Sequence, residues 1–137
     1  MIKLRTCVID DEPLAAQLIA RYVTDTPFLT LAGTFSSAQE AVRHILSGEI
    51  DLVFLDINMP QINGLEFARI IPPSCRIVFT TAYEKYAIEG FKVNALDYLL
   101  KPVSYEEFLS AASKAAAALT PAKSADEPQP DRTIIIK

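Results

Sequence analysis

The feature that most constrains the fold is a fivefold alternation of strand-like and helix-like segments. At its centre, residues 52–55 (Leu-Val-Phe-Leu) are apolar at every position, which is typical of a parallel strand covered on both faces. Five β–α units in roughly 120 residues predict an α/β domain, with a doubly wound parallel sheet of five strands and five helices. Right-handed crossovers leave few topologies, and the flavodoxin-like strand order 2-1-3-4-5 is the expected one.

The elements can be placed from local patterns. Strands are predicted at residues 3–9, 28–33, 52–55, 76–80 and 96–100. Helices are predicted from Pro13, from Ala38, over 63–71, over 84–91 and after Ser104. Pro13 suits a first helical turn, and the sequences beginning at Ser37 and Ser104 are capping boxes. The first helix is predicted to bury one apolar face made of Leu14, Ala15, Leu18, Ile19, Tyr22 and Val23.

Composition excludes several classes of function. The chain has 137 residues, a net charge of −4 and a pI near 5.0, so direct contact of this chain with DNA is not expected. No apolar run approaches the roughly 20 residues that span a bilayer, and the N-terminus lacks a signal-peptide layout. We therefore expect a cytoplasmic location without membrane contact. Cys7 and Cys75 are expected to be free and buried, and His44 to lie at the surface.

The C-terminal stretch differs from the rest. We expect one domain over residues 1–120 and a linker over 121–132, where three prolines lie among charged and polar residues. Residues 133–137, Thr-Ile-Ile-Ile-Lys, are strand-like and are interpreted as the start of a truncated second domain. The alternative is a strand that pairs with the sheet edge of this domain or of a neighbour.

Polar residues follow four of the predicted strands. Asp10, Asp11 and Glu12 follow the first strand, Asp56 the third, Thr81 the fourth and Lys101 the fifth. The carboxyl ends of parallel strands share one edge of the sheet, and ligands bind there at the switch point. Each residue alone has an ordinary explanation, such as a helix N-cap, a turn or a surface charge. Their joint placement at four strand ends favours a site.

This set of side chains suits phosphoryl chemistry. Clustered carboxylates favour a bound cation, and oxygen-only ligands suit Mg²⁺. Asp11, Asp56 and the backbone carbonyl of Asn58 are predicted as direct ligands, with Asp10 acting directly or through water. An aspartate can attack phosphorus, while an ammonium and a hydroxyl neutralise the phosphoryl oxygens. Asp56 is therefore the predicted phosphoacceptor, and Thr81 and Lys101 are the predicted phosphoryl-binding residues.

Four motifs carry a resemblance to a known family. They are Val8-Ile9-Asp10-Asp11-Glu12, Asp56-Ile57-Asn58-Met59-Pro60 with Gly64, Thr81-Ala82, and Tyr98-Leu99-Leu100-Lys101-Pro102. In this order and spacing, over residues 2 to 120, they resemble the response-regulator receiver domain of two-component signalling, which has a CheY-like fold. The resemblance implies that Ala82 helps to bind the phosphoryl group, that Thr81 and Tyr98 switch conformation, and that the Lys101–Pro102 bond is cis.

The resemblance also implies partners. A sensor histidine kinase would donate the phosphoryl group, and a homodimer would form through helix 4, strand 5 and helix 5. Candidate charges on that dimer face are Lys85, Glu89, Lys92, Asp97 and Glu106, for which a solvated surface is the alternative. Asn58 and Tyr83 would tune the lifetime of the phosphoryl group.

The segment from Thr80 to Val103 resembles receivers of the LytTR class, which carry a β-rich DNA-binding domain after a linker. DNA would then be bound only through the missing output domain. The chain is expected to be a phosphoacceptor that takes part in its own phosphorylation and dephosphorylation, not an enzyme. Two alternatives are a phosphorylation-independent dimerisation module and a phosphatase with an aspartate nucleophile. The phosphatase is disfavoured because Asn58 replaces the second Asp that such enzymes use.

Overall fold

The computed structural model describes residues 3–60, 62–83 and 95–119. The strands are β1 (Leu4–Ile9), β2 (Leu29–Phe35), β3 (Leu52–Asp56), β4 (Arg76–Thr81) and β5 (Asp97–Leu100). The helices are α1 (Pro13–Thr24), α2 (Ala38–Leu46), α3 (Gly64–Ala68) and α5 (Tyr105–Leu119). The predicted helix over 84–91 lies outside the described residues, as do the predicted linker and second domain.

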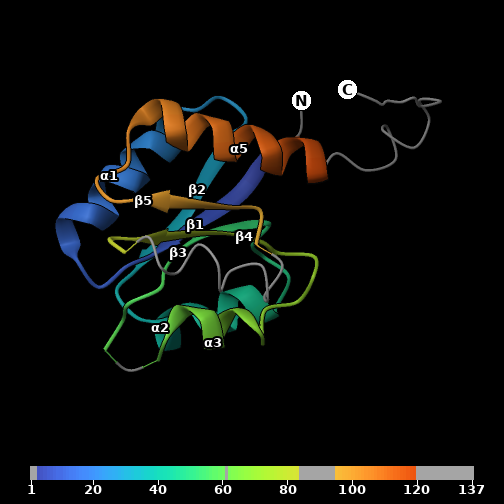
Figure 1. The fold of residues 1–137 in the computed structure, drawn as a ribbon. Helices are drawn as coiled ribbons and strands as arrows, with labels where there is room; N and C mark the ends of the chain where they lie inside the picture. The colour runs from blue at the N-terminus through green and yellow to red at the C-terminus, as the bar shows by residue number, and fades with distance from the viewer. Residues whose placement is uncertain (1–2, 61, 84–94, 120–137) are drawn as a thin grey trace.

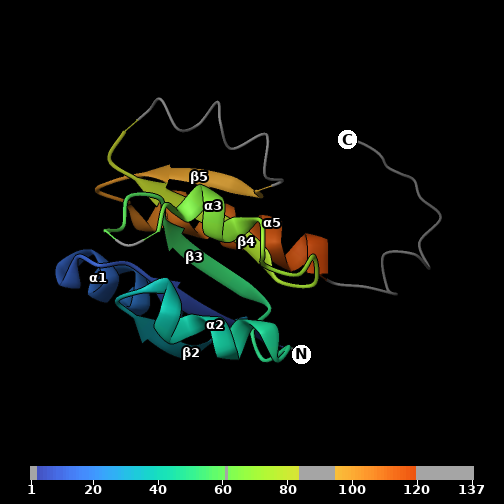
Figure 2. The same ribbon diagram turned by 90° about the horizontal axis from the view of Figure 1, so that it is seen from below.

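The five strands form one sheet in the order β2-β1-β3-β4-β5, and all neighbouring strands are parallel. The predicted topology is therefore confirmed. Helices α1 and α5 cover one face of the sheet, and α2 and α3 cover the other (Figure 1). Seen from below, α2 lies toward β2 and α3 toward β4 (Figure 2).

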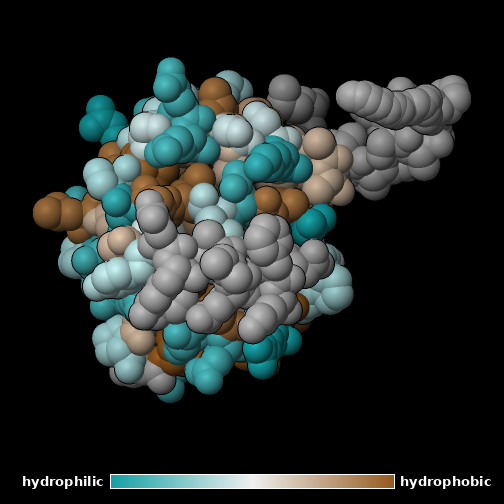
Figure 3. Space-filling model, in the orientation of Figure 1, coloured by the Kyte–Doolittle hydropathy of each residue, from teal (hydrophilic) through white to brown (hydrophobic). Residues whose placement is uncertain are grey.

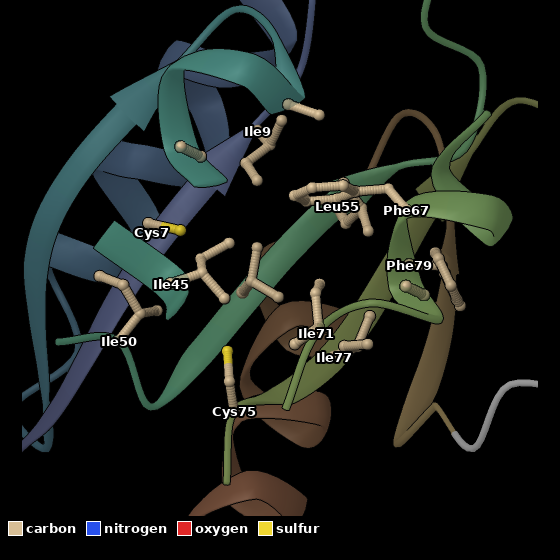
Figure 4. Close-up of a cluster of buried hydrophobic side chains, with 14 of the residues drawn as sticks. Cys7, Ile9, Ile45, Ile50, Leu55, Phe67, Ile71, Cys75, Ile77 and Phe79 are labelled. Atoms are coloured by element: carbon tan, nitrogen blue, oxygen red, sulfur yellow. The ribbon is translucent and has the colours of Figure 1, made fainter. Parts of the chain in front are cut away.

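Alternate residues of the central strands enter two separate hydrophobic cores. Val53 and Leu55 of β3 pack with Cys7 and Ile45 under α2 and α3, as Figure 4 shows for most of this cluster. Leu52 and Phe54 face the other way, toward α1 and α5. Every residue of β3 is buried, which confirms the central strand predicted from the apolar run.

Serine residues cap the N-termini of α2 and α5. Ser104 accepts a hydrogen bond from the Glu107 N–H (3.1 Å), and Glu107 accepts one from the Ser104 N–H (3.2 Å), so this capping box is complete. At α2 the Ser37 hydroxyl caps Glu40 N–H (3.3 Å). The Glu40 carboxylate, however, accepts from the N–H of Ser36, one residue before the predicted partner.

The predicted buried face of α1 is wrong at Leu14, which is 80% exposed. The fully buried residues of α1 are Ala16, Ile19 and Val23. At roughly 100° per residue, Leu14 points about 180° away from Val23. The apolar residues of α1 therefore span more of its circumference than the sheet can cover, and Leu14 is left in solvent.

The two cysteines and His44 lie where the sequence predicted them. Cys7 and Cys75 are free and buried, and burial raises the pKa of the Cys75 thiol to about 12. His44 lies at the surface, where it contacts Glu49 (3.0 Å).

On the face shown in Figure 3, hydrophobic residues occur in small groups among hydrophilic ones. Among the described residues, no helix has the length and apolar character needed to cross a membrane.

Candidate functional site

The carboxyl ends of four strands meet at one crevice. It has a volume of about 140 Å³, room for several water-sized groups. The structure brings together the predicted residues from the ends of β1, β3, β4 and β5, which come from distant parts of the sequence. The crevice is lined by Asp11, Glu12, Asp56, Asn58, Ala82, Tyr83 and Lys101.

Three carboxylates form the acidic part of the crevice. Asp10, Asp11 and Asp56 each offer an oxygen, and these oxygens lie within 4.8 Å of one another. Asp10 and Asp56 are buried. Burial and the nearby Asp10 charge raise the pKa of Asp56 to about 8, although the Lys101 ammonium acts in the opposite direction.

The same group of oxygens fits a hard divalent cation. Asp11 Oδ1 is buried and has no hydrogen-bond partner among the described residues, and a buried acceptor in that condition is costly unless something binds it. Carboxylate oxygens are the ligands that Mg²⁺ prefers. The donor set of Asp10, Asp11 and Asp56 therefore suits the ion predicted from the sequence.

Lys101 supplies the positive charge of the site. Its Nζ lies 3.1 Å from an Asp10 oxygen and 3.6 Å from an Asp56 oxygen. A third carboxylate, that of Glu12, is 2.5 Å from Nζ. Burial alone would lower the pKa of Lys101, but the bond to Glu12 and the charges of Asp10 and Asp56 outweigh it and raise that pKa.

The backbone around Asp56 is held by α3. The Asn58 N–H donates to Asp56 Oδ1 (3.1 Å), and the Gly64 N–H donates to the Ile57 carbonyl (2.7 Å). A Cβ on Gly64 would lie only 2.5 Å from the Asp56 carbonyl oxygen. Glycine at this position therefore allows the first turn of α3 to approach the strand that carries Asp56.

Thr81 lies buried at the end of β4. Its hydroxyl accepts a hydrogen bond from the Tyr83 N–H (3.1 Å) and lies 3.4 Å from Asn58 Oδ1, to which it donates. Tyr83 itself is 54% exposed. Asn58 and Tyr83 line the crevice, and the buried Thr81 hydroxyl is hydrogen-bonded to both residues.

The structure also describes the predicted switch residue Tyr98, the predicted cis-proline and two of the predicted dimer-face residues. Tyr98 is half-buried, with its ring 5.2 Å from that of Phe79, and the Lys101–Pro102 peptide bond is cis, as the resemblance implied. Asp97 pairs with Lys114 of α5 (3.0 Å) within the chain. Glu106 is exposed. The predicted dimer-face residues Lys85, Glu89 and Lys92 lie outside the described residues.

Glu12 and Arg5 make interactions that were not predicted from the sequence. Glu12 was recognised as part of an acidic run but was given no role, and it contacts Lys101. The Arg5 side chain donates two hydrogen bonds to the Asp51 carboxylate (2.9 and 3.0 Å) near the amino-terminal ends of β1 and β3, at the other end of the strands from the crevice. The register of β1 against β3 would have placed Arg5 near Asp51, but neither residue belongs to a motif.

Comparisons with known proteins agree with this geometry. The model of the response regulator receiver domain family matches residues 6–113. An uncharacterized response regulatory protein of Vibrio cholerae is 41% identical over 75% of this chain and 44% of its own length. Transcriptional regulatory protein BtsR of Escherichia coli is 38% identical over 73% and 43%, and sensory transduction protein LytT of Bacillus anthracis is 36% identical over 81% and 46%. The chain thus spans less than half the length of these relatives.

Solved structures show the same fold. The response regulatory domain of protein mrkE from Klebsiella pneumoniae superposes with a TM-score of 0.76 at 27% identity, covering 85% of this chain and 98% of that one. The beryllofluoride-activated receiver domain of DrrB superposes with a TM-score of 0.70 over 85% of this chain and 99% of its own, at 21% identity. The second likeness bears on the fold alone.

Proposed function

Because the chain belongs to the response regulator receiver domain family, we propose that it is a signalling switch controlled by phosphorylation of Asp56. One observation supports this assignment above others. Asp56 is a buried carboxylate at the end of the central strand, and it shares a crevice with two further acids and an ammonium. This is an arrangement for a phosphoryl group and a cation rather than for packing.

The phosphoryl donor is a phosphohistidine of a sensor histidine kinase. An Asp56 carboxylate oxygen forms a bond to phosphorus while the phosphorus–nitrogen bond breaks, and its electron pair returns to the imidazole. Asp56 must be ionised to attack. Burial and the Asp10 charge raise the pKa of Asp56, whereas the Lys101 ammonium and the Asn58 N–H favour the charged form that attacks.

Asp10, Asp11 and Asp56 would hold Mg²⁺, with the Asn58 carbonyl as a further ligand. When bound, the ion supplies positive charge to the carboxylates and to the phosphoryl oxygens. Lys101 contributes an ammonium from the other side of the crevice. The backbone at Ala82, which lines the crevice, and the buried Thr81 hydroxyl contribute hydrogen-bond donors.

The switch couples this site to a distant surface. Thr81 leaves its contact with Asn58 and moves to the phosphoryl oxygens, and Tyr98 turns further inward. At the surface formed by β5, α5 and the helix predicted over 84–91, the population of conformations then shifts toward one that forms a homodimer. The Asp97–Lys114 pair lies on this surface, and exchanging it for a contact between chains is one route to that dimer.

The output is transcriptional. Matches to BtsR and LytT support a LytTR-class regulator in which a following domain binds DNA and this chain controls it. The receiver acts in the cytoplasm as a phosphoacceptor, not as a conventional enzyme. Tyr83 and Asn58, at the rim of the crevice, govern how long the phosphoryl group survives by limiting access of water.

The test is intact mass after incubation with acetyl phosphate and Mg²⁺. Wild type should gain one phosphoryl group, Asp56→Asn should gain none, and the exposed control Asp25→Asn should behave as wild type. No gain in wild type would reject the Asp56 mechanism and favour a dimerisation module that does not require phosphorylation. Continuous release of inorganic phosphate with many turnovers would favour a phosphatase.

A further inference from the structure

The ammonium of Lys101 is shared among three carboxylates. Its shortest contact is with Glu12 (2.5 Å), followed by Asp10 (3.1 Å) and Asp56 (3.6 Å). The function proposed above requires this ammonium at the phosphoryl oxygens. A residue that holds it elsewhere therefore affects the reaction.

Glu12 differs from the other two acids in its exposure. Its side chain is 62% exposed, whereas those of Asp10 and Asp56 are almost fully buried. Glu12 stands at the N-cap of α1, yet its side chain makes no capping hydrogen bond. Its carboxylate is thus directed to Lys101 instead of to the helix.

We propose that Glu12 is a positioning residue that holds the Lys101 ammonium at the rim of the crevice until a phosphoryl group arrives. This inference rests on the proposed function. Of the three partners, Glu12 releases the ammonium at the lowest cost, because its exposed carboxylate regains water.

The proposal predicts that removing the Glu12 charge makes phosphoryl uptake by Asp56 faster. Glu12 slows phosphoryl uptake by competing for Lys101, and it recaptures the ammonium when the phosphoryl group leaves. Glu12→Gln keeps the size of the side chain and removes the charge. With acetyl phosphate and saturating Mg²⁺, it should speed the labelling of Asp56 by about twofold to fivefold, the range that an exposed ion pair supports.

A control variant and a double variant show whether the contact with Lys101 causes the acceleration. Glu49→Gln removes an equally exposed carboxylate that pairs with His44, and it should leave the rate unchanged. In a Lys101→Met background, Glu12→Gln should no longer accelerate labelling, because there is no ammonium to release. An unchanged or slower rate in Glu12→Gln, or equal acceleration in both backgrounds, overturns the inference.

A readout without phosphate or metal tests the contact itself. The ¹³Cε signal of Lys101 in the metal-free chain should shift in Glu12→Gln and stay in place in Glu49→Gln. If the signal does not shift, the contact is absent in solution and the inference fails while the proposed function stands. If wild type takes up no phosphoryl group, the proposed function fails and this inference fails with it.

Discussion

At the scale of single residues, Gly64 sets how closely α3 approaches the backbone of Asp56. An added Cβ would lie 2.5 Å from the Asp56 carbonyl oxygen and 2.8 Å from the Ile57 Cα, both backbone atoms that cannot turn aside. Gly64→Ala should therefore lower the free energy of unfolding by about 1–3 kcal/mol, the usual cost of overpacking. It should also slow phosphorylation of Asp56. Urea denaturation and acetyl phosphate labelling measure the two effects.

Gly33 provides the comparison for that substitution. Its added Cβ would meet only the ring of Phe35, 2.9 Å away, and a side chain can move. Gly33→Ala should thus be milder and should leave labelling of Asp56 unaffected. Equal losses of stability in the two variants would show that the close approach of α3 is not the cause.

The Arg5–Asp51 pair gives stability a defined pH dependence. Partial burial by itself would raise the pKa of Asp51, but hydrogen bonds from the Arg5 side chain and backbone, with the Arg5 charge, lower it below its ordinary value. A lowered folded-state pKa contributes stability above the unfolded pKa of about 3.9, and that contribution is lost as the pH falls through the folded pKa.

Asp51→Asn should therefore be less stable than wild type at pH 7, and the difference should shrink below about pH 4. Urea denaturation of both proteins at pH 7 and in acid measures it. Asp25→Asn, which alters an exposed carboxylate outside the pair, should show no such difference. A gap between wild type and Asp51→Asn that stays constant into acid would contradict the assignment.

The sequence predicted site residues where a simple geometric rule applies. Asp56, Thr81 and Lys101 lie at the ends of parallel strands, and those ends must meet at one edge of the sheet. The contact of Glu12 with Lys101 and the exposure of Leu14 were not predicted, for a different reason. Their environment depends on the rotation of α1 about its axis, which tertiary packing decides and the apolar pattern does not.

At the scale of elements, the capping box of α5 is the clearest local signal that the structure retains. Ser104→Ala removes the acceptor for the Glu107 N–H and should cost about 1 kcal/mol. Ser110→Ala, at an exposed position inside the same helix, should be neutral or slightly stabilising. Thermal unfolding of the two variants measures the contrast. Equal effects would mean that the cap does not contribute.

Element boundaries were less predictable than element types. Helix α3 was expected over 63–71 but covers only Gly64–Ala68, because the chain leaves the helix in turns before the proline pair at Pro72. Strand β2 runs two residues past the expected Gly33, to Phe35. Its register against β1 shifts between Thr6 and Cys7, and this irregularity has no signature in the apolar pattern.

At the scale of the whole molecule, the strand order could be predicted because connection rules leave few alternatives for five β–α units. The same topology gathers acidic residues of β1 and β3 at the switch point. A fold that places three carboxylates within 4.8 Å loses stability to their repulsion. Its stability must therefore depend on what occupies the crevice.

Mg²⁺ should consequently stabilise the entire domain, because the three carboxylates come together only in the folded chain. At ten times its Kd, the ion should add about 1.4 kcal/mol to the free energy of unfolding and raise Tm by several degrees. A chelator should reverse the shift. Asp11→Asn should lose most of it, whereas Asp25→Asn, outside the crevice, should keep it. An equal rise in all three proteins would assign the effect to general ionic strength, and the acidic crevice would not then be the site that binds the ion.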